Sequence, residues 1–364
     1  MTRAAATVGR IDWSVIGLVV LLGAVSVFNL HSTSIATGTT VYLRHLYWLL
    51  IGLVVMGAVA AINYRNLQRV APFFYGVVVL LLALVLAVGK EVNGSRRWLD
   101  LGFVGFQPSE LAKLAIILNL ANWFQRVPRP AGYALRDLVP VALLLGVPMF
   151  LVLQEPDLGH TLMLMFIGIS MLAYERFEKR ALMTVLLLGL VSAVPLWKFV
   201  LRDYQKDRVL TLLDGKADVH GAGWHARQAR VAVGSGGLIG KGHGDGTQVA
   251  GGFLPENHTD FVFAHLSEEL GLLGAGLVLA IYLLLIVAAL RSAAQARDKF
   301  GGHVAVGVGA LIFWHVVMNI GMVLNLLPVT GVTLPLLSYG GTSVLTVMAA
   351  MGLLLNISLR RTVF

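Results

Sequence analysis

The most polar stretch of this otherwise apolar chain runs from Val233 to Gly274. Glycines crowd its first part, and an apolar run of membrane length begins near its end. A chain that keeps so polar a stretch against such a run is expected to use it for chemistry or recognition. The groups that could do chemistry there are Lys241, Asp245, Gln248, Glu256, Asn257, His258, Thr259 and Asp260.

Asp260 is the sharpest candidate for a general base. It lies between Thr259 and Phe261, where the apolar run begins. The charged form of a carboxylate is disfavoured beside a region of low dielectric constant, and this suits a group that must accept a proton. An acidic residue at the start of a helix is also favoured by the helix macrodipole alone. Residue type leaves both interpretations open.

Two common kinds of site do not fit the polar stretch. A phosphate-binding loop needs Ser or Thr after its lysine, whereas Gly242 follows Lys241. The glycines are therefore expected to form a tightly turning loop or to let the backbone approach a substrate. Five histidines lack the close pairing typical of zinc sites, so a structural zinc is not expected. They are His220, His225, His243, His258 and His265.

Glu110 and Lys113 lie one helical turn apart within the apolar run 109–125. They could form an i,i+3 ion pair, with Ser109 as the N-cap of the helix. Ionisable residues inside a membrane span are also candidates for a functional site by default. Both expectations require the two side chains to face the protein interior rather than lipid.

Three further segments carry informative residues. Asp157 follows Pro156 where two apolar runs meet, so it could cap a helix or form a wall of a site. Arg96 and Arg97 lie in a loop expected outside the membrane, which favours an anionic ligand. Segment 328–341 contains two prolines and three glycines, which predicts a broken, re-entrant segment that lines a cavity.

The composition indicates a helical membrane protein. Of the 364 residues, 57% are hydrophobic and 13% are charged, and the mean hydropathy is +0.79. A soluble domain has about a quarter of its residues charged. The net charge of +9 then indicates basic cytoplasmic loops rather than a nucleic-acid partner. The absence of cysteine excludes disulfides.

The apolar runs predict an all-α polytopic protein with about ten transmembrane helices, each needing roughly 20 residues. Basic residues gather in alternate connections, which predicts that both termini are cytoplasmic. The long segment 201–265 then lies outside, and within it residues 224–233 have helical spacing. One domain, 1–364, is expected. The candidate spans are 11–30, 41–62, 71–89, 109–125, 138–155, 157–174, 181–200, 266–290, 302–325 and 338–357.

The motifs together resemble the SEDS family (shape, elongation, division and sporulation), the peptidoglycan polymerases of bacteria. They occur in the family order and cover essentially the whole chain. Gly240-Lys241-Gly242 and Leu266-Ser267-Glu268-Glu269 look like the elongation members rather than the division members. The other matching pieces are Arg97-Trp98, Gln107-Pro108-Ser109-Glu110, Pro156-Asp157-Leu158-Gly159, Arg208-Val209-Leu210, Gly234-Ser235-Gly236-Gly237-Leu238, Phe253-Leu254-Pro255-Glu256, His258-Thr259-Asp260-Phe261, Pro328-Val329-Thr330-Gly331 and Leu337-Ser338-Tyr339-Gly340-Gly341.

The sequence departs from the family pattern at four positions. Glu155 stands between Gln154 and the Pro-Asp-Leu-Gly motif, and His160 follows that motif where Thr or Ser is common. His265 replaces an apolar residue, and Trp224 stands where Tyr is usual. These changes leave every motif carboxylate in place. They bear on the shape of the pockets for the acceptor and the lipid.

The resemblance implies a glycosyltransferase of the bacterial cytoplasmic membrane that polymerises lipid II on its outer face during cell-wall elongation. Asp260 is then the expected base, and a divalent cation, Mg²⁺ or Mn²⁺, is a candidate cofactor. The lipid tail requires a groove, for which the short spans 109–125 and 157–174 are candidates. The implied substrate-binding residues are Arg97, Glu110, Lys113, Asp157, Gln228, Lys241, Glu256, His258 and Thr259.

The resemblance also implies a partner, a class B penicillin-binding protein, which is a single-span transpeptidase. Small residues crowd the cytoplasmic half of span 302–325 and could form its docking face or serve packing inside the bundle. A lipid II flippase is the rival function, since intramembrane charges suit transport too, and a scaffold is a third class. The small residues are Gly301, Gly302, Ala305, Gly307, Gly309 and Ala310.

Overall fold

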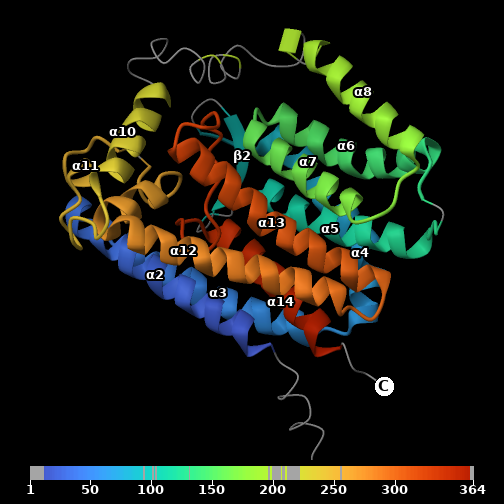
Figure 1. Ribbon diagram of the computed structural model, residues 1–364, viewed down its shortest axis with the longest axis horizontal. Coiled ribbons are helices and arrows are strands. Elements are labelled where there is room, and N and C mark those ends of the chain that lie inside the picture. The colour runs from blue at the N-terminus through green and yellow to red at the C-terminus, as the bar shows by residue number, and fades with distance from the viewer. Residues whose placement is uncertain are drawn as a thin grey trace, which may run out of the picture.

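The computed structural model is a bundle of long helices with one small sheet among the described residues (Figure 1). It describes residues 12–92, 95–100, 102, 105–130, 132–195, 197–198, 206, 210, 222–254 and 256–360. Arg208, Val209, His220 and Pro255, named in the sequence analysis, lie outside the described residues.

Each of the ten predicted spans falls on a helix. Seven helical segments among the described residues are long and apolar enough to cross a membrane, so the chain is a multi-pass membrane protein. The seven lie on α2, α3, α4, α6, α12, α13 and α14, and crossings by α5, α7 and α8 remain predictions. The bounds are α2 (Trp13–Thr37), α3 (Val41–Ala61), α4 (Tyr64–Val88), α5 (Pro108–Arg126), α6 (Leu138–Gln154), α7 (Leu158–Ala173), α8 (Lys179–Pro195), α12 (Val262–Ala294), α13 (Lys299–Val323) and α14 (Gly341–Leu359).

Burial separates inner from outer helices. The apolar windows of α13 and α14 are 72% and 83% buried, whereas those of α4 and α6 are each 22% buried. In a bilayer the exposed apolar side chains of the outer helices face lipid. Helix α5 is buried along nearly its whole length, including Glu110, Lys113, Asn119 and Asn122. The polar groups of α5 therefore face protein, not lipid.

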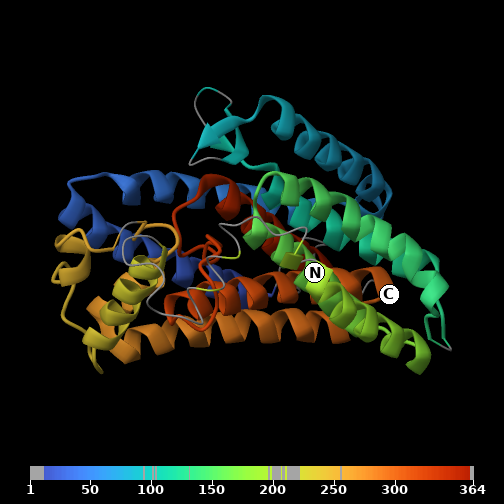
Figure 2. The same ribbon diagram turned by 90° about the horizontal axis from the view of Figure 1, so that it is seen from above.

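A short antiparallel sheet follows α4. It consists of β1 (Lys90–Val92), β2 (Ser95–Asp100) and β3 (Gly105–Phe106), in the order β1-β2-β3. Lys90 pairs with Trp98, and Leu99 pairs with Phe106. Strand β2 contacts α4 and α5, and Figure 2 shows the sheet at the end of α4. The sheet thereby holds Arg97 beside the buried part of the bundle.

The small residues of span 302–325 pack inside the bundle. Residues Gly301 to Ala310 of α13 are all buried. A Cβ atom at Gly307 would lie 2.7 Å from a methyl group of Ile117 and 3.0 Å from the sulfur of Met171. The glycine therefore permits close packing of α13 against α5 and α7. The alternative that this stripe is a docking face for the partner is wrong.

The glycine-rich loop packs against the start of α12. The helical spacing of 224–233 is confirmed by α10 (Ala222–Ser235), and α11 (Thr247–Ala250) follows it; both lie at the end of the molecule where α12 begins (Figure 1). Cβ atoms at Gly236 and Gly240 would each lie 2.0 Å from a carbonyl oxygen, of Ser267 and Glu269 respectively. These two glycines are needed because two backbones touch.

Candidate active site

A tight turn presents Asp260 at the start of α12. Glu256 adopts a positive φ of 52°, and its carbonyl oxygen accepts hydrogen bonds from the backbone N–H groups of Thr259 and Phe261. The hydroxyl of Thr259 donates to the Glu256 carboxylate at 2.9 Å. Asp260 is half-buried and precedes the helix N-cap, Phe261. Glu256, Thr259 and Asp260 thus share one turn.

The turn is fastened to the non-helical segment between α13 and α14. The side-chain amide of Asn319 on α13 donates to the carbonyl oxygens of Asp260, at 2.9 Å, and Val332, at 2.8 Å. The backbone N–H of Tyr339 donates to the His258 carbonyl oxygen at 2.8 Å. Gly331 has a φ of 71°, and a Cβ there would lie 3.4 Å from Asp260 Oδ2. The predicted broken segment therefore forms a wall beside Asp260.

Glu110 and Lys113 form a buried ion pair. Lys113 Nζ lies 2.9 Å from Glu110 Oε2, and neither side chain is more than 2% exposed. Lys113 also donates to His315 Nε2 at 2.9 Å. The other nitrogen of His315, Nδ1, donates to the Thr333 carbonyl oxygen at 2.7 Å, which leaves Nε2 free to accept. The pair expected from the i,i+3 spacing is confirmed.

The N-cap expected for that helix is wrong. Helix α5 begins at Pro108 with Gln107 as its N-cap, and no side chain caps it. The Ser109 hydroxyl is buried without a hydrogen-bond partner. Proline is favoured in the first turn of a helix because it lacks the N–H that would otherwise need a partner there. The helix therefore begins at Pro108, and the N-cap lies two residues earlier than expected, at Gln107. Glu110 remains in the first turn.

His160 joins this pair to Asp157. His160 Nε2 lies 2.9 Å from Glu110 Oε1, and Nδ1 lies 3.0 Å from Asp157 Oδ2. Asp157 caps α7 by accepting from the His160 backbone N–H at 3.0 Å. Arg97 of β2 approaches Asp157 Oδ2 to 3.6 Å and donates to the Glu155 carbonyl oxygen at 3.3 Å. We call the set Arg97, Asp157, His160, Glu110, Lys113 and His315 the charge network.

The charge network and Asp260 lie on either side of segment 330–331. Gly159, in the first turn of α7, packs so closely that a Cβ there would lie 2.5 Å from the Thr330 carbonyl oxygen. The next residue, Gly331, faces Asp260. Three motifs far apart in sequence therefore meet at this point. Asp260 and the start of α7 therefore pack against the same short segment.

Two carboxyl groups at the junction of α6 and α7 are strongly perturbed. Burial, and then the negative charge of Asp157, raise the pKa of Glu155 to about 8. Both Glu155 carboxyl oxygens are buried without hydrogen-bond partners, which fits a neutral group. Burial opposes the ionisation of Asp157, but His160 and Arg97 outweigh it and hold the pKa of Asp157 well below its usual range. The network carboxylate is thus ionised beside a neutral neighbour.

Comparison with known proteins identifies the family. The chain matches the family FtsW/RodA/SpoVE, described as "Cell cycle protein", over residues 7–363. The chain belongs to this family. It is 43% identical over 310 residues to the peptidoglycan glycosyltransferase MrdB of Escherichia coli (strain K12), covering 85% of this chain and 83% of that protein. It is 35% identical over 324 residues to the probable peptidoglycan glycosyltransferase FtsW of Coxiella burnetii, covering 87% and 86%.

Solved structures show the same FtsW/RodA/SpoVE fold. One match, described as "Structural coordination of polymerization and crosslinking by a peptidoglycan synthase complex", has a TM-score of 0.84 and 32% identity and covers 97% of this chain and 99% of that one. The crystal structure of the Thermus thermophilus rod shape determining protein RodA has a TM-score of 0.69 and 30% identity, covering 96% of each chain. The resemblance drawn from the motifs is therefore confirmed.

A second set of buried carboxylates, Glu268 and Glu269 on α12, binds the glycine-rich loop. Glu268 accepts from Lys241, from the hydroxyl of Thr247 and from the backbone N–H groups of Thr247 and Gln248. Glu269 accepts from the hydroxyl of Ser32 and from the backbone N–H of Gly244. We call Glu268, Glu269 and these partners the loop anchor. It ties loop 240–250 to α12 and to α2.

The remaining predicted site residues, Gln228 and His258, do not belong to the charge network or the loop anchor. Gln228 is half-buried on α10, and the ring of His258 lies near that of Tyr339 in a tilted arrangement, with ring centroids 5.9 Å apart. Sequence reasoning missed His315 and Asn319, although a polar residue inside an apolar span was the signal available for both. Among the described residues, no group of three or more His, Asp or Glu side chains could hold a metal ion.

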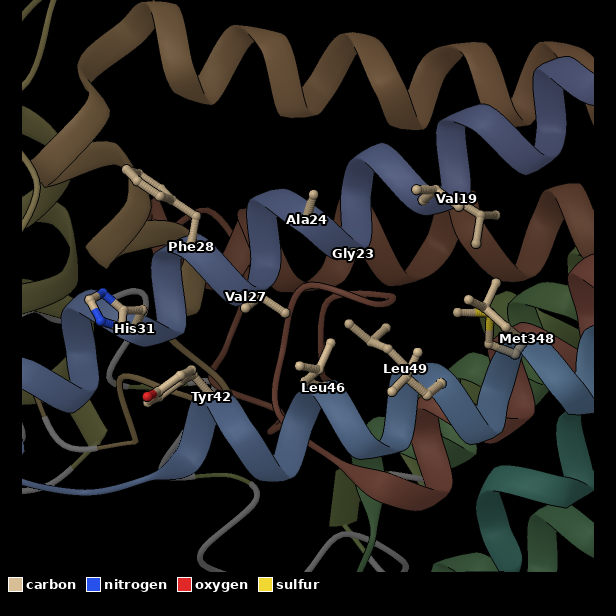
Figure 3. Close-up of a pocket in the computed structure, with 13 residues that line it drawn as sticks. Val19, Gly23, Ala24, Val27, Phe28, His31, Tyr42, Leu46, Leu49 and Met348 are labelled. Atoms are coloured by element: carbon tan, nitrogen blue, oxygen red, sulfur yellow. The ribbon is translucent and has the colours of Figure 1, made fainter.

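An apolar groove of about 550 Å³ lies between α2 and α3, with Met348 of α14 at one end (Figure 3). Gly23 and Ala24 leave room on its α2 wall, and His31 and Tyr42 stand at its other end. His31 Nδ1 lies 3.2 Å from His243 Nε2 of the glycine-rich loop. The expectation placed a lipid groove near spans 109–125 and 157–174; this groove lies elsewhere.

Proposed function

We propose that this chain is a peptidoglycan glycosyltransferase that polymerises lipid II on the outer face of the bacterial cytoplasmic membrane. The names of its relatives, above all MrdB at 43% identity, support this activity. The observation that carries the proposal is the half-buried Asp260 held across segment 330–331 from a buried charge network. Such an arrangement offers a base and a cationic neighbour to the same substrate.

The chemistry requires one inverting displacement. The donor sugar is α-linked to a diphosphate, and the product is a β-1,4 link. Asp260 accepts the proton of the acceptor hydroxyl as its oxygen attacks the anomeric carbon, and the bond to the diphosphate oxygen breaks. A positioned general base typically contributes about 10²–10⁴-fold in rate. The turn fastened by Asn319 fixes the carboxylate for this step.

The diphosphate leaving group needs positive charge more than it needs a proton. Arg97 is the network cation with an accessible side chain, 27% exposed, and it is our candidate for direct contact. Lys113 is fully buried, so it acts through Glu110 and His315. Lys241 is 25% exposed, and its ammonium is bound to Glu268. A diphosphate that reached Lys241 would compete with that carboxylate.

A divalent cation is a separate proposal. The described residues do not form a metal site by themselves, so Mg²⁺ or Mn²⁺ would need substrate oxygens as ligands. We assign no catalytic step to it. Titration of activity with a chelator, followed by add-back of either ion, tests the proposal. Full activity after chelation would exclude a required cation.

The polyprenyl tail of lipid II is proposed to occupy the groove between α2 and α3. Its walls are almost entirely apolar, as a hydrocarbon chain requires. The groove ends at His31, which contacts the glycine-rich loop through His243. Gly23→Leu and Ala24→Leu would fill it and should raise the KM for lipid II. Outer-face substitutions on α4, such as Leu80→Ala, are the control.

The proposed partner is a class B penicillin-binding protein. A matching structure is described as a complex that coordinates polymerisation and crosslinking. Holding both enzymes together raises the local concentration of the nascent strand for the transpeptidase. The buried glycines of α13 cannot provide the docking face, so an outer helix face must. Cytoplasmic termini are part of the same proposal and follow from the distribution of basic residues.

The deciding experiment is polymerisation of lipid II by the purified chain in detergent. The wild type should make polymer, whereas Asp260→Ala and Asp260→Asn should lose about 10²–10⁴-fold in rate at an unchanged melting temperature. Activity within a few-fold of wild type would remove Asp260 from the role of base. A flippase would make no polymer and would move lipid II only in sealed vesicles, and a scaffold would do neither.

A further inference from the structure

His160 occupies a position between two carboxylates that forces both ring nitrogens to donate. Its Nδ1 and Nε2 lie 3.0 and 2.9 Å from oxygens of Asp157 and Glu110. An ionised carboxylate only accepts hydrogen bonds, and an imidazole that donates from both nitrogens carries a positive charge. Each carboxylate also faces a second cation, Arg97 or Lys113, which favours its ionised form.

Without His160 the network would consist of two separate ion pairs. The outer pair is Arg97 with Asp157, and the inner pair is Lys113 with Glu110. With His160 the charges alternate along one continuous row from β2 through α7 to α5. The row then holds three cations and two carboxylates. Interactions between these groups are strong because four of the five side chains are almost fully buried.

We propose that His160 is a positioning residue that couples the outer ion pair to the inner one and gives the charge network a net positive charge for the diphosphate of the substrate. The inference rests on the proposed function and deepens it at the same site. Through Asp157, His160 fixes the carboxylate that Arg97 approaches, and Arg97 is the accessible member. Position 160 is one of the four at which this sequence departs from the family pattern.

The kinetic test uses His160→Gln and His160→Thr in the detergent assay with lipid II. Loss of one positive charge near the diphosphate should raise KM about tenfold, equivalent to about 1.4 kcal/mol, while kcat stays within a few-fold. His303→Gln is the matched control, because His303 is also buried beside a carboxylate, Glu175, but near the start of α13. An unchanged KM in both His160 variants would overturn the proposal.

A double-mutant cycle tests the coupling itself. Asp157→Asn and Glu110→Gln are measured singly and together, in the wild-type and the His160→Gln backgrounds. Coupled residues should show an interaction of about three-fold or more in wild type, and the effects should multiply independently once His160 is replaced. Equal coupling in both backgrounds would show that His160 does not link the pairs.

The two proposals fail in different ways. If wild type makes no polymer, or if Asp260→Ala still does, the proposed function fails whatever His160 does. If the wild type polymerises and Asp260→Ala does not, the His160 variants decide the inference alone. Loss of folded protein in both His160 variants, with His303→Gln folded, would assign His160 to the stability of the bundle and overturn the kinetic role.

Discussion

The charge network and the loop anchor both bury glutamate carboxylates, yet they satisfy them differently. Glu268 of the loop anchor accepts from the backbone N–H groups of Thr247 and Gln248 as well as from Lys241. Glu110 of the charge network receives the side chains of Lys113 and His160. Backbone donors cannot change charge or swing away. A carboxylate bound by backbone N–H groups therefore stabilises the fold. A carboxylate bound by ionisable side chains can change its interactions when a ligand binds.

This difference separates residues that the sequence groups together. Lys241 and Lys113 were both predicted to bind substrate, and both form ion pairs with a buried glutamate. The ion pair of Lys241 holds a loop against α12. The ion pair of Lys113 contacts His160 and His315 directly, through Glu110 and Lys113 respectively. The comparison predicts effects on activity at one site and on stability at the other.

The largest effect is expected from Glu110→Gln against Glu268→Gln. Glu110→Gln leaves His160 and Lys113 facing a neutral group and should reduce the polymerisation rate about 100-fold or more. Glu268→Gln weakens the cap of the loop and should cost about 1–3 kcal/mol of stability, with less than a tenfold loss of rate below the melting temperature. Rates and melting temperatures of both purified variants check this. Equal losses of polymerisation rate in the two variants would contradict the functional difference between the charge network and the loop anchor.

A smaller effect is expected from two close backbone approaches, Gly159→Ala and Gly236→Ala. A Cβ at Gly159 collides with the Thr330 carbonyl oxygen, which lies next to the wall of Asp260. A Cβ at Gly236 collides with the Ser267 carbonyl oxygen in the loop region. We expect Gly159→Ala to lower kcat at least tenfold and Gly236→Ala to lower mainly the melting temperature. Gly57→Ala, with open space around its Cβ, is the control for both. A Gly159→Ala protein with normal kcat would separate segment 330–331 from catalysis.

The sequence predicted the helices well because hydrocarbon allows few alternatives. Long apolar runs must be helices there, and each predicted span falls on one. It also predicted the Glu110–Lys113 pair, because i,i+3 spacing alone places the two side chains together. The start of α5 was displaced because Pro108 outweighed Ser109 as a start signal.

The network could not be predicted in the same way. It depends on α5, α7 and α13 meeting, and the spacing of residues along one helix contains no information about its neighbours. His160 appeared only as a departure from a family motif, and His315 as a polar residue in an apolar run. The glycines of the loop were expected to form a tight turn or to let the backbone approach a substrate. In the structure, Gly236 and Gly240 instead let the loop backbone contact the backbone of α12. Which surface a glycine faces is settled by tertiary packing.

The smallest predicted effect concerns Glu155, the extra residue before the Pro-Asp-Leu-Gly motif. Its pKa is raised to about 8 from the ordinary 4.5 because it is buried beside Asp157. A raised carboxyl pKa means that the folded protein holds the proton more tightly than the unfolded chain. The contribution of this proton to the free energy of unfolding is therefore fully present below pH 4.5 and is lost as the pH rises towards 8. Above that pH, ionised Glu155 places a buried negative charge beside Asp157 and destabilises the junction between α6 and α7.

Glu155→Gln removes this loss because an amide does not ionise. The variant and the wild type should melt at similar temperatures near pH 5, and the variant should melt several degrees higher at about pH 9. Melting curves in one detergent across this range measure the difference. Glu178→Gln, at an exposed glutamate, should show no such trend. If the two proteins differ in melting temperature by the same amount at every pH, Glu155 ionises normally. Burial at this junction would then not set its charge.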